Sequence, residues 1–304
     1  MKFLLAALAI AVGTGGALAQ EAAPWAGDVA NDYWIQPDVT YSVENNYQNK
    51  LDVIYPHKGT APVPTVIYIH GGGWVFGSKA GSVLEVLPYL QMGWAAVNVD
   101  YRMASASKAP GAVEDCRCAL HWIIQNAKQY HIDTSRLVVT GHSAGGHLAL
   151  TTGMLTEEAG LDNNCAEDKG TPEPHVAAIV NWYGITDVAD LLSGADRKNY
   201  AVDWLGSALD REAIAKRVSP LTYVRKNLPP IITIHGDADP VVPYSHAVRL
   251  HEALDKAGVP NRLFTVHGGE HGQFTDADSR RAYDAIRQFL AEHGLGPVRP
   301  STQP

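Results

Sequence analysis

The stretch that most constrains this chain is Gly-His-Ser-Ala-Gly-Gly at residues 141–146, which has G-x-S-x-G spacing. The apolar run at 137–140 predicts a buried strand before it, and residues 146–155 predict a helix after it. A serine between such elements sits on a tight turn, which small neighbours permit. The turn lifts the Ser143 hydroxyl above the sheet edge, at the positive end of a helix. Ser143 is therefore a candidate nucleophile; the alternative is an ordinary glycine-rich loop.

The rest of the chain alternates between expected strands and expected helices. An antiparallel strand pair at a sheet edge is expected at 39–43 and 51–55, after an irregular arm at 20–36. Continuous apolar runs predict further strands at 65–70, 94–99, 137–140, 176–182, 231–235 and 261–267. Helices are expected at 79–92, from Pro110 onward, and at 146–155, 244–256 and 277–293, with helical patches at 188–192, 201–205 and 211–218. This order predicts an α/β fold with a mostly parallel sheet.

The N-terminus has the features of a secretory signal peptide. Met1-Lys2 is a short positive start, residues 3–12 are apolar, and Ala17-Leu18-Ala19 is a small-residue cleavage site. The apolar run is too short to span a bilayer, and no second span follows it. We therefore expect a signal peptide at 1–19, a single catalytic domain at 20–304, and a secreted or periplasmic location. The alternative is a buried N-terminal helix.

Charge and cysteine content narrow the range of partners. The net charge is −8 and no Lys/Arg cluster is present, so a nucleic-acid partner is not expected. Cys116 and Cys118 should point to different sides of a helix, and either could bridge to Cys165, leaving one free thiol. No Cys/His cluster has metal-ligand spacing, so no metal site is expected. The sequence does not indicate an oligomeric state.

A nucleophilic serine needs a base, and the base needs an acid that fixes its tautomer. The acid should follow a strand downstream of the serine. Asp237 and Asp239 both follow the strand at 231–235. Pro240 biases the residue before it toward an extended backbone, which favours Asp239 as the acid. Asp237 fits a turn-stabilising role.

The base should follow the last strand. His271 lies after the strand at 261–267, and flanking glycines give its loop the freedom to bring an imidazole over the serine. His267 ends that strand and is expected to be packed. His142 and His147 flank the nucleophile, and we expect them to pack or to line a pocket wall.

A tetrahedral intermediate needs backbone N–H donors aimed at its oxygen. One donor should be Ala144, directly after the nucleophile. The others should come from the three glycines that follow the strand at 65–70, of which Gly72 and Gly73 are preferred over Gly71. A flexible linker and a phosphate-binding loop are the alternatives, but no Lys-Ser/Thr pair follows the glycines.

Five motifs follow one another along the chain: His70-Gly71-Gly72-Gly73-Trp74, Asp100-Tyr101-Arg102, Gly141-His142-Ser143-Ala144-Gly145-Gly146, His235-Gly236-Asp237-Ala238-Asp239 and Gly269-Glu270-His271-Gly272. In this order they resemble the α/β-hydrolase superfamily, over residues 38–293. The branch that the chain is most similar to is the feruloyl- and acetyl-esterase-like carboxylesterases, which are related to the hormone-sensitive lipase group and to arylformamidases.

The resemblance implies ester hydrolysis through an acyl-enzyme, with no cofactor. It implies Ser143 as the nucleophile, His271 as the base and Asp239 as the acid that orients the base. The oxyanion hole that it implies comprises Gly72, Gly73 and Ala144.

Departures from the hormone-sensitive lipase pattern favour the feruloyl-esterase-like branch. Residues 20–37 are too few for a large N-terminal cap, and the acid lies in a short H-G-x-x-D motif. An open site and export together suggest acetyl or feruloyl esters on plant polysaccharide, or small-molecule esters. Trp74, Trp182 and Tyr183 are candidate substrate contacts, or core residues. Alternative functions are an arylformamidase or other amide hydrolase, a short-chain lipase, and a non-catalytic binding domain.

Overall fold

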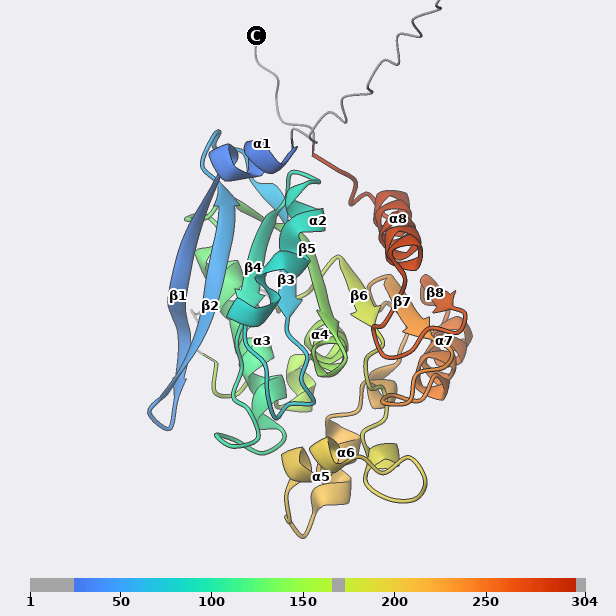
Figure 1. Ribbon diagram of the computed structural model, residues 1–304. Coiled ribbons are helices and arrows are strands. Elements are labelled where there is room, and N and C mark those ends of the chain that lie inside the picture. Colours follow the sequence, from blue (N-terminus) through green and yellow to red (C-terminus); the bar gives the residue numbers. More distant parts are fainter. Residues whose placement is uncertain (1–24, 166–172, 299–304) are drawn as a thin grey trace, which may run out of the picture.

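A computed structural model of the protein describes residues 25–165 and 173–298, so the predicted signal peptide lies outside the described residues. Within these ranges one eight-stranded sheet has the order β1-β2-β4-β3-β5-β6-β7-β8 (Figure 1). β2 is antiparallel to β1 and β4, and the remaining pairs are parallel. The strands are β1 (Tyr33–Glu44), β2 (Tyr47–Pro56), β3 (Val63–Ile69), β4 (Ala95–Val99), β5 (Ile132–His142), β6 (Ala178–Trp182), β7 (Ile231–Gly236) and β8 (Asn261–Val266).

Helices cover both faces of the sheet, which explains why its inner strands are apolar on both sides. Along β3, Ile67 and Ile69 pack into one layer, whereas Val66 and Tyr68 pack into the other. The first layer contains α3 (Gly111–Asn126), α4 (Ala144–Met154) and α7 (Ser245–Ala257). The second contains α1 (Trp25–Asp32), α2 (Leu87–Leu90) and α8 (Asp276–Glu292). The predicted α/β-hydrolase fold with a mostly parallel sheet is confirmed.

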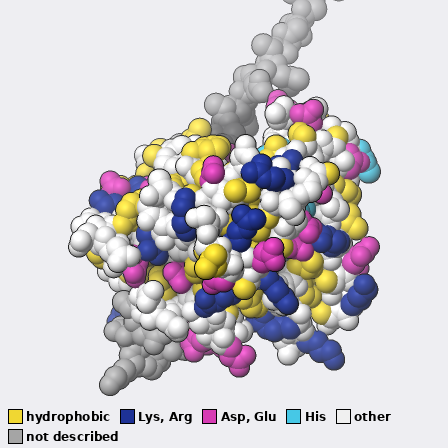
Figure 2. Space-filling model, turned by 90° about the horizontal axis from the view of Figure 1, so that it is seen from below, with side chains coloured by type: hydrophobic (Ala, Val, Ile, Leu, Met, Phe, Trp, Pro, Cys, Tyr) yellow, Lys and Arg dark blue, Asp and Glu magenta, His cyan; other side chains and the backbone are white. Residues whose placement is uncertain are grey.

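A small helical insertion separates β6 from β7. It holds α5 (Asn199–Leu205), α6 (Arg211–Arg217) and short 3-10 turns at Ala189–Leu191 and Pro220–Tyr223. In Figure 1 the insertion lies beyond the carboxyl ends of the strands, where the serine turn also lies. On the face seen in Figure 2, which is viewed from that end, acidic and basic side chains are interspersed with hydrophobic ones.

Two expected elements were wrong. The segment at 20–36 is not an irregular arm in its described part, because α1 occupies Trp25–Asp32 and β1 begins at Tyr33. The single helix expected at 79–92 is a 3-10 helix at Ala80–Val86 followed by the short α2. Pro88 lies in the first turn of α2, and a proline there cannot continue an α-helix from the residues before it, because it lacks an N–H.

The predicted antiparallel pair at the sheet edge is confirmed and is longer than expected. The register of β1 against β2 shifts between Gln36 and Val39. Pro37 lies at that shift, and the edge position tolerates it because none of the described strands pairs with the outer side of β1 and needs its missing N–H. Asp38 has a φ of 55°, and its amide donates to Asp52 Oδ1 at 2.8 Å.

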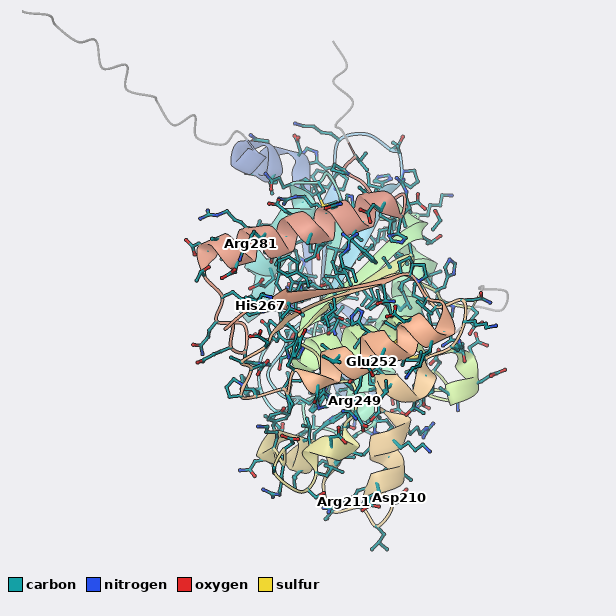
Figure 3. All side chains as sticks on the ribbon, turned by 90° about the vertical axis from the view of Figure 1, so that its right-hand side faces the viewer. Asp210, Arg211, Arg249, Glu252, His267 and Arg281 are labelled. Atoms are coloured by element: carbon teal, nitrogen blue, oxygen red, sulfur yellow. A yellow bond between two sulfur atoms is a disulfide. The ribbon has the colours of Figure 1, made fainter. Side chains whose placement is uncertain are left out.

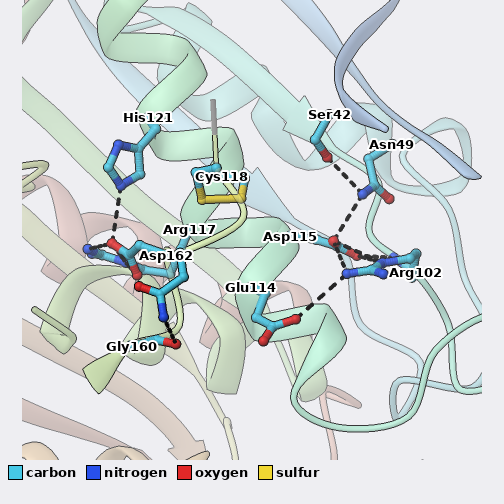
Figure 4. The surroundings of a disulfide bond; sticks show 12 residues. Ser42, Asn49, Arg102, Glu114, Asp115, Arg117, Cys118, His121, Gly160 and Asp162 are labelled. Atoms are coloured by element: carbon cyan, nitrogen blue, oxygen red, sulfur yellow. Dashed lines mark hydrogen bonds and ion pairs between the residues drawn. A yellow bond between two sulfur atoms is a disulfide. The ribbon is translucent and has the colours of Figure 1, made fainter. Parts of the chain in front are cut away.

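A disulfide joins Cys118 in α3 to Cys165, so Cys116 is the free thiol, and it is buried (Figure 4). The bridge lies beside a buried ion pair between Arg117 and Asp162, in which Arg117 Nε is 3.0 Å from both carboxylate oxygens. The disulfide and the ion pair both fix the loop after α4 to α3. This resolves the pairing that the sequence left open.

No helix in the two described ranges has the length and apolar character needed to cross a bilayer.

Candidate active site

Ser143 occupies a strained turn between β5 and α4. Its φ of 57° and ψ of −119° are unfavourable for any residue but glycine. Two hydrogen bonds hold the turn: the Ser143 amide donates to Trp182 O at 2.9 Å, and the His147 amide donates to Ser143 O at 3.0 Å. A Cβ added to Gly145 would lie 2.0 Å from Ile69 O, so only glycine fits there. These constraints explain the G-x-S-x-G spacing.

The structure brings the predicted base and acid to this serine. His271 Nε2 lies 2.9 Å from Ser143 Oγ, and His271 Nδ1 lies 2.7 Å from Asp239 Oδ2. The three side chains meet because β5, β7 and β8 are parallel, so the loops at their carboxyl ends lie on one edge of the sheet. The carboxylate can only accept, which places the imidazole proton on Nδ1 and leaves the Nε2 lone pair for the serine hydroxyl.

Asp239 is held as a buried carboxylate. Its Oδ1 accepts from the amides of Val241 at 2.7 Å and Val242 at 2.9 Å, and its side chain is fully buried. Burial raises the pKa of Asp239, but the contacts with His235 and His271 outweigh it, so the pKa lies well below its usual range. The carboxylate therefore stays charged opposite His271.

Asp237, the alternative acid, points to another histidine. Its Oδ2 lies 2.8 Å from His267 Nδ1, and its Oδ1 accepts from the Gly268 amide at 2.6 Å. Both partners lie in the loop after β8, so these side-chain contacts join two loops, whereas the sequence suggested that Asp237 stabilises its own turn. The expected packing of His267, labelled in Figure 3, was wrong, because 86% of its side chain is exposed.

The glycine loop after β3 lies against the serine turn. A Cβ added to Gly71 would lie 3.5 Å from Ser143 Cβ. Gly72 and Gly73 have φ values of 112° and 58°, and within the described ranges their amides donate to no acceptor. Ala144 is the first residue of α4, so its amide has no carbonyl partner within the helix. Ala144 thus directly follows Ser143, while Gly72 and Gly73 directly follow the residue that contacts Ser143.

The insertion contacts both the glycine loop and the loop after β7 that holds Asp239, which we call the acid loop. A Cβ added to Gly73 would lie 2.9 Å from Tyr200 Cβ, and the Tyr200 hydroxyl donates to Val241 O at 3.3 Å. Lys198 Nζ donates to Pro240 O at 2.8 Å. The sequence indicated a helix here, but nothing in its pattern showed that the helix touches both loops.

The three aromatic residues expected near the substrate occupy different places. Trp74 lies in the core, where its fully buried ring stacks on Trp204 with centroids 4.1 Å apart and donates to His147 Nδ1 at 3.2 Å. That placement corresponds to the alternative of a core residue. Trp182 is also buried, with its ring 5.0 Å from that of His142.

Tyr183 lies beside the base, with its ring 4.7 Å from the His271 ring. Phe76, which the sequence did not single out, is 69% exposed. Its ring adjoins the glycine loop, because a Cβ added to Gly72 would lie 3.2 Å from Phe76 Cδ2. In the sequence, the feature that could have indicated Phe76 as a site residue is its position two residues after Trp74.

His142, which precedes the nucleophile, contacts Tyr68: the Tyr68 hydroxyl lies 2.7 Å from His142 Nδ1. Burial, with a smaller contribution from His271, lowers the pKa of His142 to about 3. His142 is therefore neutral at physiological pH.

For a resident metal ion, the described residues offer no group of three or more His, Cys, Asp or Glu side chains.

The fold and the arrangement of Ser143, His271 and Asp239 are those of the α/β-hydrolase superfamily. The BD-FAE family model matches residues 51–254, which is more than half of the chain, and a TAP-like protein model matches residues 211–298. The chain belongs to the BD-FAE family.

Curated relatives include two esterases of Mycobacterium tuberculosis. Esterase LipC is 32% identical over 202 residues, covering 64% of this chain and 49% of LipC. Esterase LipQ is 26% identical over 256 residues, covering 80% of this chain and 59% of LipQ. The chain thus spans only part of the length of these relatives.

For two solved structures, the match to this chain extends over nearly the whole of the solved chain. Esterase 2 of Thermogutta terrifontis with bound propionate has a TM-score of 0.73 and 27% identity, covering 88% of this chain and 97% of that structure. A truncated carbohydrate esterase from gut microbiota has a TM-score of 0.73 and 27% identity, covering 86% of this chain and 96% of that structure.

Proposed function

We propose that this protein is a serine carboxylesterase that works through an acyl-enzyme. The observation that carries the proposal is the unbroken chain of contacts from Asp239 through His271 to Ser143. This geometry prepares His271 to accept the serine proton and leaves Asp239 to stabilise the imidazolium that results.

The reaction has two halves. Ser143 Oγ attacks the ester carbonyl carbon as His271 Nε2 takes the hydroxyl proton. His271 then gives that proton to the leaving alcohol oxygen, and the carbonyl re-forms as an acyl-serine. Water attacks the acyl-serine in the same manner, with its proton passing to His271 and then to Ser143, and the carboxylic acid leaves.

The amides of Gly72, Gly73 and Ala144 serve as the oxyanion hole in this proposal. Ala144 directly follows Ser143, and Gly72 and Gly73 directly follow Gly71, which lies against Ser143. No protein acceptor in the described ranges bonds to the amides of Gly72 or Gly73. Preorganised donors of this kind stabilise the negative oxygen of both tetrahedral intermediates without reorganising during the reaction. One such donor contributes on the order of a hundred-fold or more in kcat.

For the substrate we propose acetyl or feruloyl esters, including those attached to plant polysaccharide. The similarity to a carbohydrate esterase and the predicted signal peptide at 1–19 support this assignment. The exposed Phe76 ring beside the glycine loop offers a surface on which a sugar or aromatic ring can stack. Tyr183 is the second aromatic contact that we propose, because it lies beside His271.

A panel of esters tests this proposal. Methyl ferulate, acetylated xylan, 4-nitrophenyl acetate and an arylformamide are compared by kcat/KM, with Ser143→Ala as the background for each. We expect the acetyl or feruloyl esters to be cleaved well above that background. Turnover of the arylformamide alone, or no difference between the wild type and Ser143→Ala, would contradict the proposal.

A further inference from the structure

A second imidazole contacts the acid of the triad. His235 lies in β7 and is fully buried. Its Nε2 lies 3.0 Å from Val242 O and 3.3 Å from Asp239 Oδ2. That carboxylate oxygen is the one that faces His271, so it lies between two imidazole rings.

The surroundings of His235 fix its tautomer. A carbonyl oxygen only accepts, so the contact with Val242 O requires the proton on Nε2. Nδ1 is buried and has no hydrogen-bond partner within the described ranges. A proton on Nδ1 would be a buried donor without an acceptor, which is costly, whereas an unpartnered lone pair is tolerated more easily. The Nε2–H therefore faces both Val242 O and Asp239 Oδ2.

We propose that His235 is a positioning residue, whose Nε2–H orients the Asp239 carboxylate and draws negative charge away from the oxygen that pairs with His271. This inference rests on the proposed function of the triad. It gives a role to a buried histidine in a strand whose other buried side chains, those of Ile231, Ile232, Thr233 and Ile234, do not titrate.

Removal of the Nε2 donor should have two effects. Asp239 Oδ2 would carry more negative charge toward His271, which stabilises the imidazolium and makes the base harder to deprotonate. The acidic limb of the kcat/KM profile would then move to higher pH. The carboxylate would also lose one of its orienting contacts, so kcat would fall.

Other titratable groups face this cluster from the neighbouring elements. The Tyr244 ring lies 5.7 Å from the His235 ring, and the Tyr183 ring lies 6.4 Å from it. Burial raises the pKa of Tyr183 above its usual value, so it does not ionise in the assay range. Further titratable groups near the cluster are His142 from the serine turn, Tyr200 from α5, His246 from α7 and His271 from the loop after β8.

Asparagine and glutamine at position 235 separate the donor from the side chain's other properties. The Gln amide nitrogen occupies nearly the place of His Nε2, whereas the shorter Asn amide reaches only the place of Nδ1. We expect His235→Gln to retain the wild-type acidic limb and most of kcat. We expect His235→Asn and His235→Leu to raise the acidic limb by on the order of half a pH unit or more, and to lower kcat by about tenfold.

His251→Leu is the matched control. This histidine is also buried, in α7, where its Nδ1 lies 2.6 Å from Asn261 Oδ1, and no contact joins it to the triad. It reports the cost of losing a buried imidazole, and we expect its acidic limb to coincide with that of the wild type.

The profiles are measured with 4-nitrophenyl acetate on variants shown to be folded by circular dichroism. Coincident acidic limbs in the wild type, His235→Gln and His235→Asn would overturn the inference. Should His235→Leu not fold, the Asn and Gln pair still decides the question. Ser143→Ala separates this result from the proposed function: if that variant keeps its activity, the triad proposal itself fails.

Discussion

His147, which lies in α4 four residues after Ser143, should make the protein less stable in mild acid. Its ring is fully buried and has a partner at each nitrogen. Nε2 lies 2.7 Å from Val218 O and carries the proton, while Nδ1 accepts from Trp74 Nε1 at 3.2 Å. Protonation of Nδ1 would place two donors face to face, so the folded protein resists it.

The size of this effect follows from the pKa. Burial lowers the pKa of His147 to about 4, against the opposing effect of the Val218 hydrogen bond. A histidine in the unfolded chain has a pKa of about 6.5, so acidification protonates the unfolded chain first and favours the unfolded state. The stability linked to His147 is therefore present above about pH 6.5 and is lost as pH falls toward about 4. Between about pH 7 and about pH 5, the loss is about 2 kcal/mol.

The perturbation is His147→Gln, whose amide can still donate to Val218 O but does not titrate. Urea unfolding across this pH range gives the free energy of unfolding for each protein. We expect the wild type to lose about 2 kcal/mol more than the variant between about pH 7 and about pH 5. His175→Gln is the control, because this histidine is exposed and should leave the pH dependence as in the wild type. Parallel curves for His147→Gln and the wild type would refute the reasoning.

Three further predictions concern separate parts of the molecule. Replacement of Cys118 by serine removes a disulfide that closes a loop with a sequence separation of 47, and it should lower the free energy of unfolding by about 4 kcal/mol in denaturant titrations. A reduced wild type as stable as the oxidised wild type would contradict this prediction. Asp239→Asn should reduce kcat by about ten-thousand-fold, whereas Asp237→Asn should stay within about twofold; comparable losses would contradict the assignment of the acid. Phe76→Ala should raise KM for methyl ferulate by about five-fold while leaving the turnover of 4-nitrophenyl acetate unchanged, and an equal effect on both esters would argue against a stacking role.

Much of this fold is encoded in local patterns. The apolar runs at 65–70 and 231–235 predict buried parallel strands because both of their faces must be covered, and the structure places strands there. α1 was not predicted, although Trp25, Val29 and Ala30 recur at helical spacing, because it has only eight residues and they include Gly27, which weakens a helix. The prediction of one helix over 79–92 did not take Pro88 into account. Pro88 has no N–H to continue the hydrogen bonding of the preceding turn, so two short helices form instead.

The candidate site was predictable where chain order and turn chemistry carry the information. Ser143, Asp239 and His271 each follow a strand, so parallel topology alone brings their loops together. Contacts between distant side chains carry no such signal. The approach of His235 to the acid loop, and that of Tyr200 to the glycine loop, depend on packing that no local pattern records.

Covalent labelling of Ser143 is the most direct test of the central claim, that this serine is the nucleophile. The chain is incubated with paraoxon, digested and analysed by mass spectrometry, with Ser143→Ala treated in parallel. We predict one diethylphosphoryl group per chain, located on Ser143, together with complete loss of esterase activity. A label on another residue, or an equal extent of labelling in Ser143→Ala, would contradict the account.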